Sequence, residues 1–90
     1  MARLLTLEEI KALTKDTDVY IEQSGYFLPD IVYAATVEEI GDRFLALWHS
    51  ELVIFKNHGK KPFGWRCWIG RPTDSERNAV AWTKRSAEEG

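Results

Sequence analysis

One stretch decides the fold, Phe63-Gly64-Trp65-Arg66-Cys67-Trp68-Ile69, which lies between Pro62 and Gly70. Its aromatic and apolar side chains predict a β-strand, in which successive side chains point to opposite faces. One face would carry Phe63, Trp65, Cys67 and Ile69, and the other would carry Arg66 and Trp68. We therefore expect the first face to pack into a core and the second face to point away from it.

Four earlier stretches have the same two-residue period and also predict strands: 19–23, 30–36, 43–48 and 52–55. Segment 36–40 repeats the pattern of residues 6–10 and fits either a capped helical turn or the tail of the strand before it. Strands this short favour a small, strongly bent antiparallel sheet of four or five strands, of which an SH3-like half-barrel is one form.

A short helix is predicted near the start of the chain. Thr6 and Glu9 have the spacing of a capping box, in which each side chain accepts a hydrogen bond from the other's backbone amide. Leu5 and Ile10 stand at the positions of a hydrophobic staple. The apolar spacing that follows predicts about two turns, and a helix this short must pack against the sheet to be stable.

A second helix is predicted near the end. Thr73 and Glu76 repeat the capping-box spacing, and the helix should continue to about Trp82, whose ring would anchor it. Residues 86–90 are expected to be a frayed tail. Two helices around an antiparallel sheet predict an α+β fold in one domain that spans residues 1–85.

Size and composition limit the function. Ninety residues are enough for a single domain, and 44% hydrophobic residues are enough for a core. The one cysteine, Cys67, excludes an internal disulfide and suits a reducing cytosol. The apolar runs are too short to cross a membrane, so we expect a cytoplasmic protein.

The net charge of −2 conceals an uneven distribution along the chain. Residues 1–55 contain four basic and ten acidic side chains, a balance of −6, whereas residues 56–90 contain eight basic and four acidic ones, a balance of +4. No acid occurs between residues 56 and 72. The slightly negative net charge argues against a protein that coats nucleic acid without specificity. The acid-free segment could nevertheless bind an anionic group locally.

The candidate binding residues come from this acid-free segment and are Lys56, Lys60, Lys61, Arg66, Trp68 and Arg71. Cationic groups beside flat rings suit phosphate contact with base stacking. Arginine and tryptophan are equally common anchors of protein–protein interfaces. The alternative is that the lysines are merely solvated and that at least two of the four tryptophans belong to the core.

Metal binding and catalysis are not predicted. His49, His58 and Cys67 are too widely spaced for the paired ligands of a structural zinc site. Cys67 should be buried between core residues, where a thiol is inert. Adjacent acids point apart on helices and strands, and the glycines are isolated. We expect no catalytic residue, no metal and no cofactor, and interpret the protein as not an enzyme.

Two parts of the sequence resemble a known group of proteins. They are residues 6–13 with the strand after them, and the string Trp-Arg-x-Trp…Arg-Pro-Thr-x-x-Glu-Arg, which covers Trp65 to Arg77. Both resemble short, largely uncharacterised proteins of prophages and mobile elements of Gram-positive bacteria. The match covers about a third of the chain and implies no catalytic residue. It implies a small phage protein that acts by binding host machinery, including defence systems.

Three function classes follow. The favoured one is a non-enzymatic protein-binding module, a phage-type inhibitor of a host defence protein such as a CRISPR effector nuclease. The alternative is a nucleotide or oligonucleotide binder that uses Arg66, Arg71 and a stacking tryptophan. The third is a minor virion or assembly protein, which would self-associate into a homo-oligomer.

Overall fold

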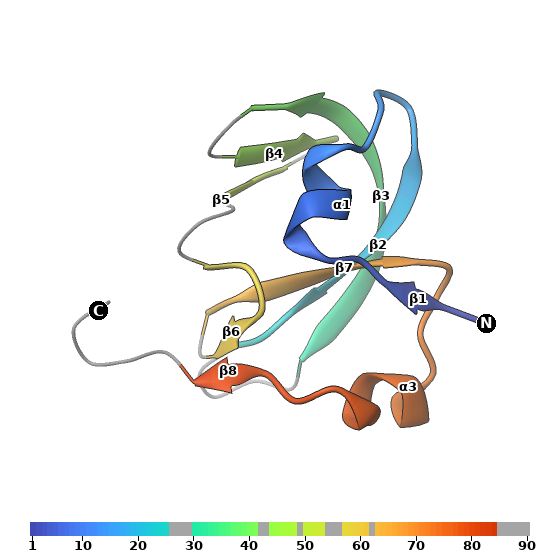
Figure 1. The fold of residues 1–90 in the computed structure, drawn as a ribbon, viewed down its shortest axis with the longest axis vertical. Helices are drawn as coiled ribbons and strands as arrows, with labels where there is room; N and C mark the ends of the chain where they lie inside the picture. The colour runs from blue at the N-terminus through green and yellow to red at the C-terminus, as the bar shows by residue number, and fades with distance from the viewer. Residues whose placement is uncertain (26–29, 42–43, 49, 54–56, 62, 85–90) are drawn as a thin grey trace.

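The structure, a computed structural model, describes residues 1–25, 30–41, 44–48, 50–53, 57–61 and 63–84. Within these residues, six strands form an antiparallel sheet in the order β1-β7-β2-β3-β4-β5 (Figure 1). They are β1 (Arg3–Leu4), β2 (Asp18–Gln23), β3 (Ile31–Ile40), β4 (Phe44–Leu47), β5 (Ser50–Val53) and β7 (Trp65–Ile69). A parallel pair, β6 (Lys60–Lys61) and β8 (Thr83–Lys84), lies apart from this sheet. The helices are α1 (Leu7–Lys11) and α3 (Asp74–Ala79), so the class is α+β.

Strand β3 connects the two halves of the sheet. Its first part pairs with β2 and its last part with β4, and the register shifts between Val37 and Glu39. The strand curves through this region, and α1 packs on the side toward which it bends (Figure 1). Segment 36–40 is therefore strand. Val37 is fully buried, and its backbone exchanges hydrogen bonds with Asp16 and Thr17, which leaves no capped helical turn there.

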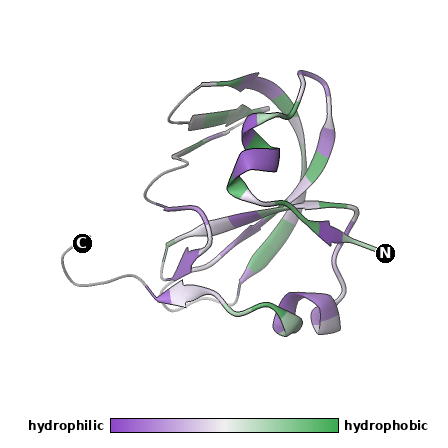
Figure 2. Ribbon diagram, viewed as in Figure 1, coloured by the Kyte–Doolittle hydropathy of each residue, from purple (hydrophilic) through white to green (hydrophobic). Residues whose placement is uncertain are grey.

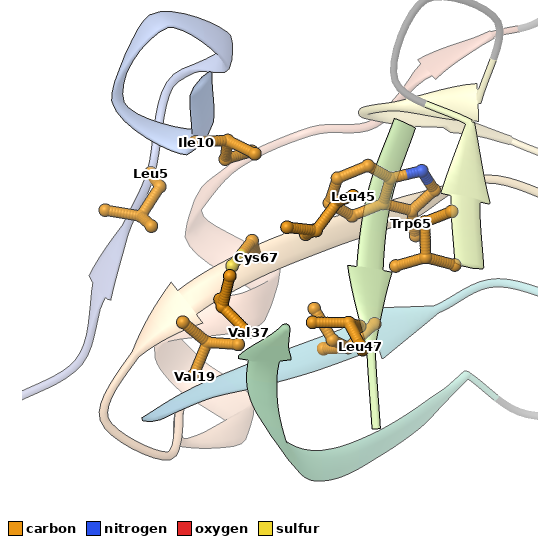
Figure 3. Close-up of a cluster of buried hydrophobic side chains, with 10 residues drawn as sticks. Leu5, Ile10, Val19, Val37, Leu45, Leu47, Trp65 and Cys67 are labelled. Carbon is orange, nitrogen blue, oxygen red and sulfur yellow. The ribbon is translucent and has the colours of Figure 1, made fainter. Parts of the chain in front are cut away.

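The core lies between α1 and the inner face of the sheet, the face toward α1 (Figure 3). Trp65 and Cys67 of β7 both point into it, as their alternation predicts. Phe63 does not follow this pattern, because its side chain is 61% exposed and its φ of 65° takes it out of the strand. The other fully or nearly fully buried members are Leu5, Ile10, Val19, Ile21, Val37, Leu45, Leu47 and Leu52.

Both predicted capping boxes are present. The Glu9 amide donates to Thr6 Oγ1 over 3.2 Å, and the Thr6 amide donates to Glu9 Oε1 over 3.0 Å. Thr73 and Glu76 make the equivalent pair at the start of α3. The second carboxylate oxygen of Glu76 also accepts the Ala2 amide over 3.0 Å, which ties α3 to the beginning of the chain.

The helices differ in how they pack. Figure 2 shows hydrophobic and hydrophilic segments on α1, whereas α3 is hydrophilic over most of its length. Ile10 of α1 is fully buried, but no residue of α3 is. Helix α3 is therefore held by polar contacts rather than by an apolar face.

Three predictions about the fold are wrong. Within the described residues the main sheet has six strands rather than four or five, because the two-residue strand β1 pairs with the side of β7 opposite β2. The second helix ends at Ala79 instead of Trp82, and β8 follows it. The first helix, for which about two turns are predicted, has five residues. The strand expected at 52–55 lies at 50–53, and positions 43, 54 and 55 fall outside the described residues.

No helix among the described residues is long and apolar enough to span a membrane. The expected tail at 86–90 lies outside the described residues.

Candidate functional site: a buried ionic cluster and an open cleft

A buried ionic cluster lies on the outer face of β2 and β7, the face turned away from α1. Glu22 pairs with Arg66 across the two strands, and Trp68, the next residue of β7 on the same face, lies opposite Tyr20. Glu22 Oε1 accepts from Arg66 Nε over 2.9 Å and from Trp68 Nε1 over 3.0 Å. Glu22 Oε2 accepts from Arg77 Nε over 3.0 Å. We call Glu22, Arg66, Trp68 and Arg77 the outer cluster.

Arg66 also holds the end of α3 in place. Its Nη1 donates to the Val80 carbonyl over 2.7 Å, and its Nη2 donates to the Arg77 carbonyl over 3.1 Å. A positive charge is favourable there, because the last carbonyls of a helix have no partner within the helix. The guanidinium also lies 4.2 Å from the ring centroid of Trp82. These contacts explain why the helix ends before Val80 and why Trp82 packs in an extended segment.

The structure corrects the expected positions of two candidate binding residues. Arg66 is 3% exposed and Trp68 is 2% exposed, so neither offers its side chain to a ligand in this fold. The signal for this was present in the sequence, since aromatic residues on both faces of residues 65–69 indicate a strand that is covered on both sides. Arg66, Trp68 and Arg77, three residues of the string that carries the resemblance, thus form an internal contact between the sheet and α3.

The other candidate residues lie apart from the outer cluster. Lys61 Nζ is 3.1 Å from Asp30 Oδ2 and 5.5 Å from the ring centroid of Trp82. Lys60 precedes it on β6, next to β8. Arg71 is exposed, with its guanidinium 5.0 Å from the ring centroid of Tyr20. Lys56 lies outside the described residues. The segment without acids in the sequence therefore has an acidic neighbour in the fold, because Asp30 pairs with Lys61.

An open cleft of about 380 Å³ lies over β2 and β3, and we call it the outer cleft. Its lining residues are Asp18, Val19, Tyr20, Ala34, Ala35, Thr36 and Trp48. Trp48 is 64% exposed, and its amide donates to the Thr36 carbonyl over 3.2 Å, which places it beside β3. The sequence does not predict this site, because its pattern makes Trp48 the last residue of a strand, whereas in the structure Trp48 lies in the turn after β4.

The four tryptophans differ in how far they are buried. Trp65 and Trp68 are interior, which confirms that at least two of the four belong to packed regions. Trp82 is half-buried and Trp48 is the exposed one. A partner that needs a large aromatic contact on the described surface would therefore meet Trp48 first.

Two titratable side chains have shifted pKa values because of burial. Burial raises the pKa of the Cys67 thiol to about 12, so the thiol stays protonated, as expected for a packed cysteine. Burial, helped by the charge of Arg66, lowers the pKa of His58 below 6.5. In the part of the chain that the structure describes, no three His, Cys, Asp or Glu side chains cluster in a way that could hold a metal ion.

No protein-family model, curated protein or solved structure matches this chain. The resemblance to prophage and mobile-element proteins stays a prediction.

Proposed function

We propose that this chain is a non-enzymatic protein-binding module that contacts its partner through the outer cleft. The observation that carries the proposal is Trp48, which lines the cleft and is nevertheless 64% exposed. Tryptophan, tyrosine and arginine are the residue types that contribute most to protein–protein binding. Trp48 and Tyr20 both line the cleft.

The charges around the cleft support a basic partner surface. Asp18 lines the cleft, and Asp16 and Glu38 are exposed on neighbouring positions of the chain. The half-buried lysines of β6 and the exposed Lys84 of β8 belong to a separate two-stranded sheet (Figure 1). An acidic surface such as this one can compete with nucleic acid for a positively charged channel, because surfaces of opposite charge attract each other and associate faster.

The partner class that fits both the charges and the resemblance is a host defence protein, such as a CRISPR effector nuclease. The proposed setting is the bacterial cytoplasm, and the proposed mode of action is blockage of the effector's nucleic-acid channel. A nucleotide binder is supported less well, since two of the side chains it would use, Arg66 and Trp68, are buried.

The test measures binding to a purified candidate effector and inhibition of its nuclease activity. Trp48→Ala should weaken binding by about 30-fold, because removal of a central aromatic anchor typically costs about 2 kcal/mol. Phe63→Ala is the matched control, since Phe63 is equally exposed at 61% but does not line the cleft. The control should bind within about twofold of the native chain.

Two outcomes would contradict the proposal. One is an affinity of Trp48→Ala equal to that of the native chain. The other is loss of binding in the double substitution Lys60→Glu and Lys61→Glu while Trp48→Ala still binds. The second outcome would move the interface to β6 and favour an anionic ligand.

A further inference from the structure

We infer that the outer cleft binds the guanidinium of an arginine side chain that the partner protein presents. This inference rests on the proposed function and specifies the chemical group that the cleft recognises. Three features support it: two aromatic rings that line the cleft, a small residue opposite one of them on the neighbouring strand, and one carboxylate.

The strand register explains why the cleft forms at this place. Tyr20 of β2 lies opposite Ala34 of β3, and Asp18 lies opposite Thr36. These four side chains share the outer face, because they occupy alternate positions of paired strands. Ala34 has only a methyl group and is exposed, so the sheet surface is hollow beside the Tyr20 ring. Trp48, hydrogen-bonded through its amide to the Thr36 carbonyl, lines the cleft from the β3 side.

The size of the cleft suits one side chain. Pockets for small molecules range from about 300 to 1,000 Å³, and this cleft of about 380 Å³ is near the lower limit. A helix or a strand would not fit inside it. A single long side chain from a docked protein would fit, with the flat end of the chain between aromatic surfaces.

The charge of the cleft selects a cation. Of the seven residues that line it, all within the described part of the chain, Asp18 is the one with a carboxylate side chain. Thr36 Oγ1 donates to Asp18 Oδ1 over 3.1 Å and so orients the carboxylate. Aromatic ring faces attract cations. A guanidinium is preferred to an ammonium because it is planar, weakly hydrated and able to stack while it contacts a carboxylate.

One of the guanidinium–ring contacts within the chain involves a ring that lines the cleft. The Arg71 guanidinium lies 5.0 Å from the centroid of the Tyr20 ring. Arg71 does not line the cleft, so it leaves the space open, but it places a positive charge beside Tyr20. This charge should repel an incoming arginine and attract an incoming phosphate. Replacement of Arg71 by a neutral residue should therefore have opposite effects on the binding of a cationic and of an anionic ligand.

The experiment uses the full chain and N-acetyl-L-arginine amide as the probe. The indole ¹H–¹⁵N signal of Trp48, assigned by its loss in Trp48→Phe, reports binding. We expect this signal to shift and saturate with the arginine probe. The neutral isostere N-acetyl-L-citrulline amide should bind at least threefold more weakly, because it lacks the charge. N-acetyl-L-lysine amide should bind more weakly than the arginine probe, and AMP should leave the signal unshifted.

Two variants test the electrostatics with the same probe. Asp18→Asn should weaken arginine binding about threefold to tenfold, because it removes the charge but keeps the shape. Arg71→Gln should leave arginine binding unchanged or strengthen it. Both side chains are exposed, and a preserved spectrum outside the cleft confirms that each variant is folded.

The inference is overturned if the Trp48 signal does not shift with the arginine probe, if citrulline binds equally well, or if Arg71→Gln abolishes binding. Its failure can be separated from failure of the proposed function. If the arginine probe does not bind but Trp48→Ala still weakens binding to the effector, only the arginine inference is wrong. If the arginine probe binds but Trp48→Ala binds the effector as tightly as the native chain does, the proposed protein interface is wrong.

Discussion

Replacing Glu22 by glutamine should strongly destabilise the fold, because Glu22 is the counter-ion that Arg66 and Arg77 of the outer cluster share. Its carboxylate is 1% exposed and accepts from Arg66, Trp68 and Arg77. Glutamine can keep one acceptor oxygen toward Arg66. It would, however, turn an NH₂ group toward another donor and leave the Arg66 guanidinium buried without its counter-ion.

The expected loss is about 3–4 kcal/mol. Removal of one partner from a buried ion pair typically costs about 3–5 kcal/mol, and the retained oxygen places Glu22→Gln toward the lower part of that range. A domain of this length has a stability of about 5–10 kcal/mol. The variant should therefore fold marginally, with a melting temperature lower by about 15–25 °C.

Urea unfolding followed by tryptophan fluorescence, with thermal unfolding followed by circular dichroism, measures both quantities. Glu38→Gln is the matched control, because Glu38 is exposed on β3 and should change stability by less than about 0.5 kcal/mol. Combining Glu22→Gln with Arg66→Gln should cost at least about 1 kcal/mol less than the sum of the two single losses. A loss below about 1 kcal/mol in Glu22→Gln would refute the role assigned to the outer cluster.

Three further predictions concern buried or crowded positions. Cys67 should react with a thiol reagent only after unfolding, since its pKa of about 12 keeps it protonated; fast reaction of the native chain would contradict this. Gly64→Ala should unfold at much lower urea than Gly59→Ala. A Cβ at Gly64 would lie 1.7 Å from the Lys60 carbonyl oxygen, whereas one at Gly59 meets nothing within 4 Å and adds only the backbone strain of a φ of 71°; equal midpoints would contradict it. The lowered pKa of His58 means that the folded state disfavours protonation, so stability should fall as the pH drops below about 6.5, and His58→Gln should reduce that slope; an unchanged slope in this variant would contradict it.

The local features of the fold are predictable from the sequence. Both helix starts follow from capping boxes, which depend on residues only three positions apart. Most strands follow from the two-residue period, and the inward position of Cys67 follows from the same period. These predictions succeed because the interactions that decide them are close in the sequence.

The features that depend on distant contacts are not predictable in the same way. Strands β1, β6 and β8 have two residues each and form because of their partners rather than any pattern of their own. The burial of Arg66 depends on Glu22, which lies 44 positions away, and on the carbonyls at the end of α3. The outer cleft depends on the register of β2 with β3.

Acrylamide quenching of tryptophan fluorescence tests most directly whether the ring offered to a partner is Trp48 rather than a residue of the Trp-Arg-x-Trp string. Trp48→Phe should remove the largest part of the quenchable emission, because Trp48 is 64% exposed. Trp68→Phe should leave that part intact, because Trp68 is 2% exposed. Loss of the quenchable emission in Trp68→Phe, with little change in Trp48→Phe, would contradict both the internal role of the outer cluster and the assignment of the outer cleft as the binding surface.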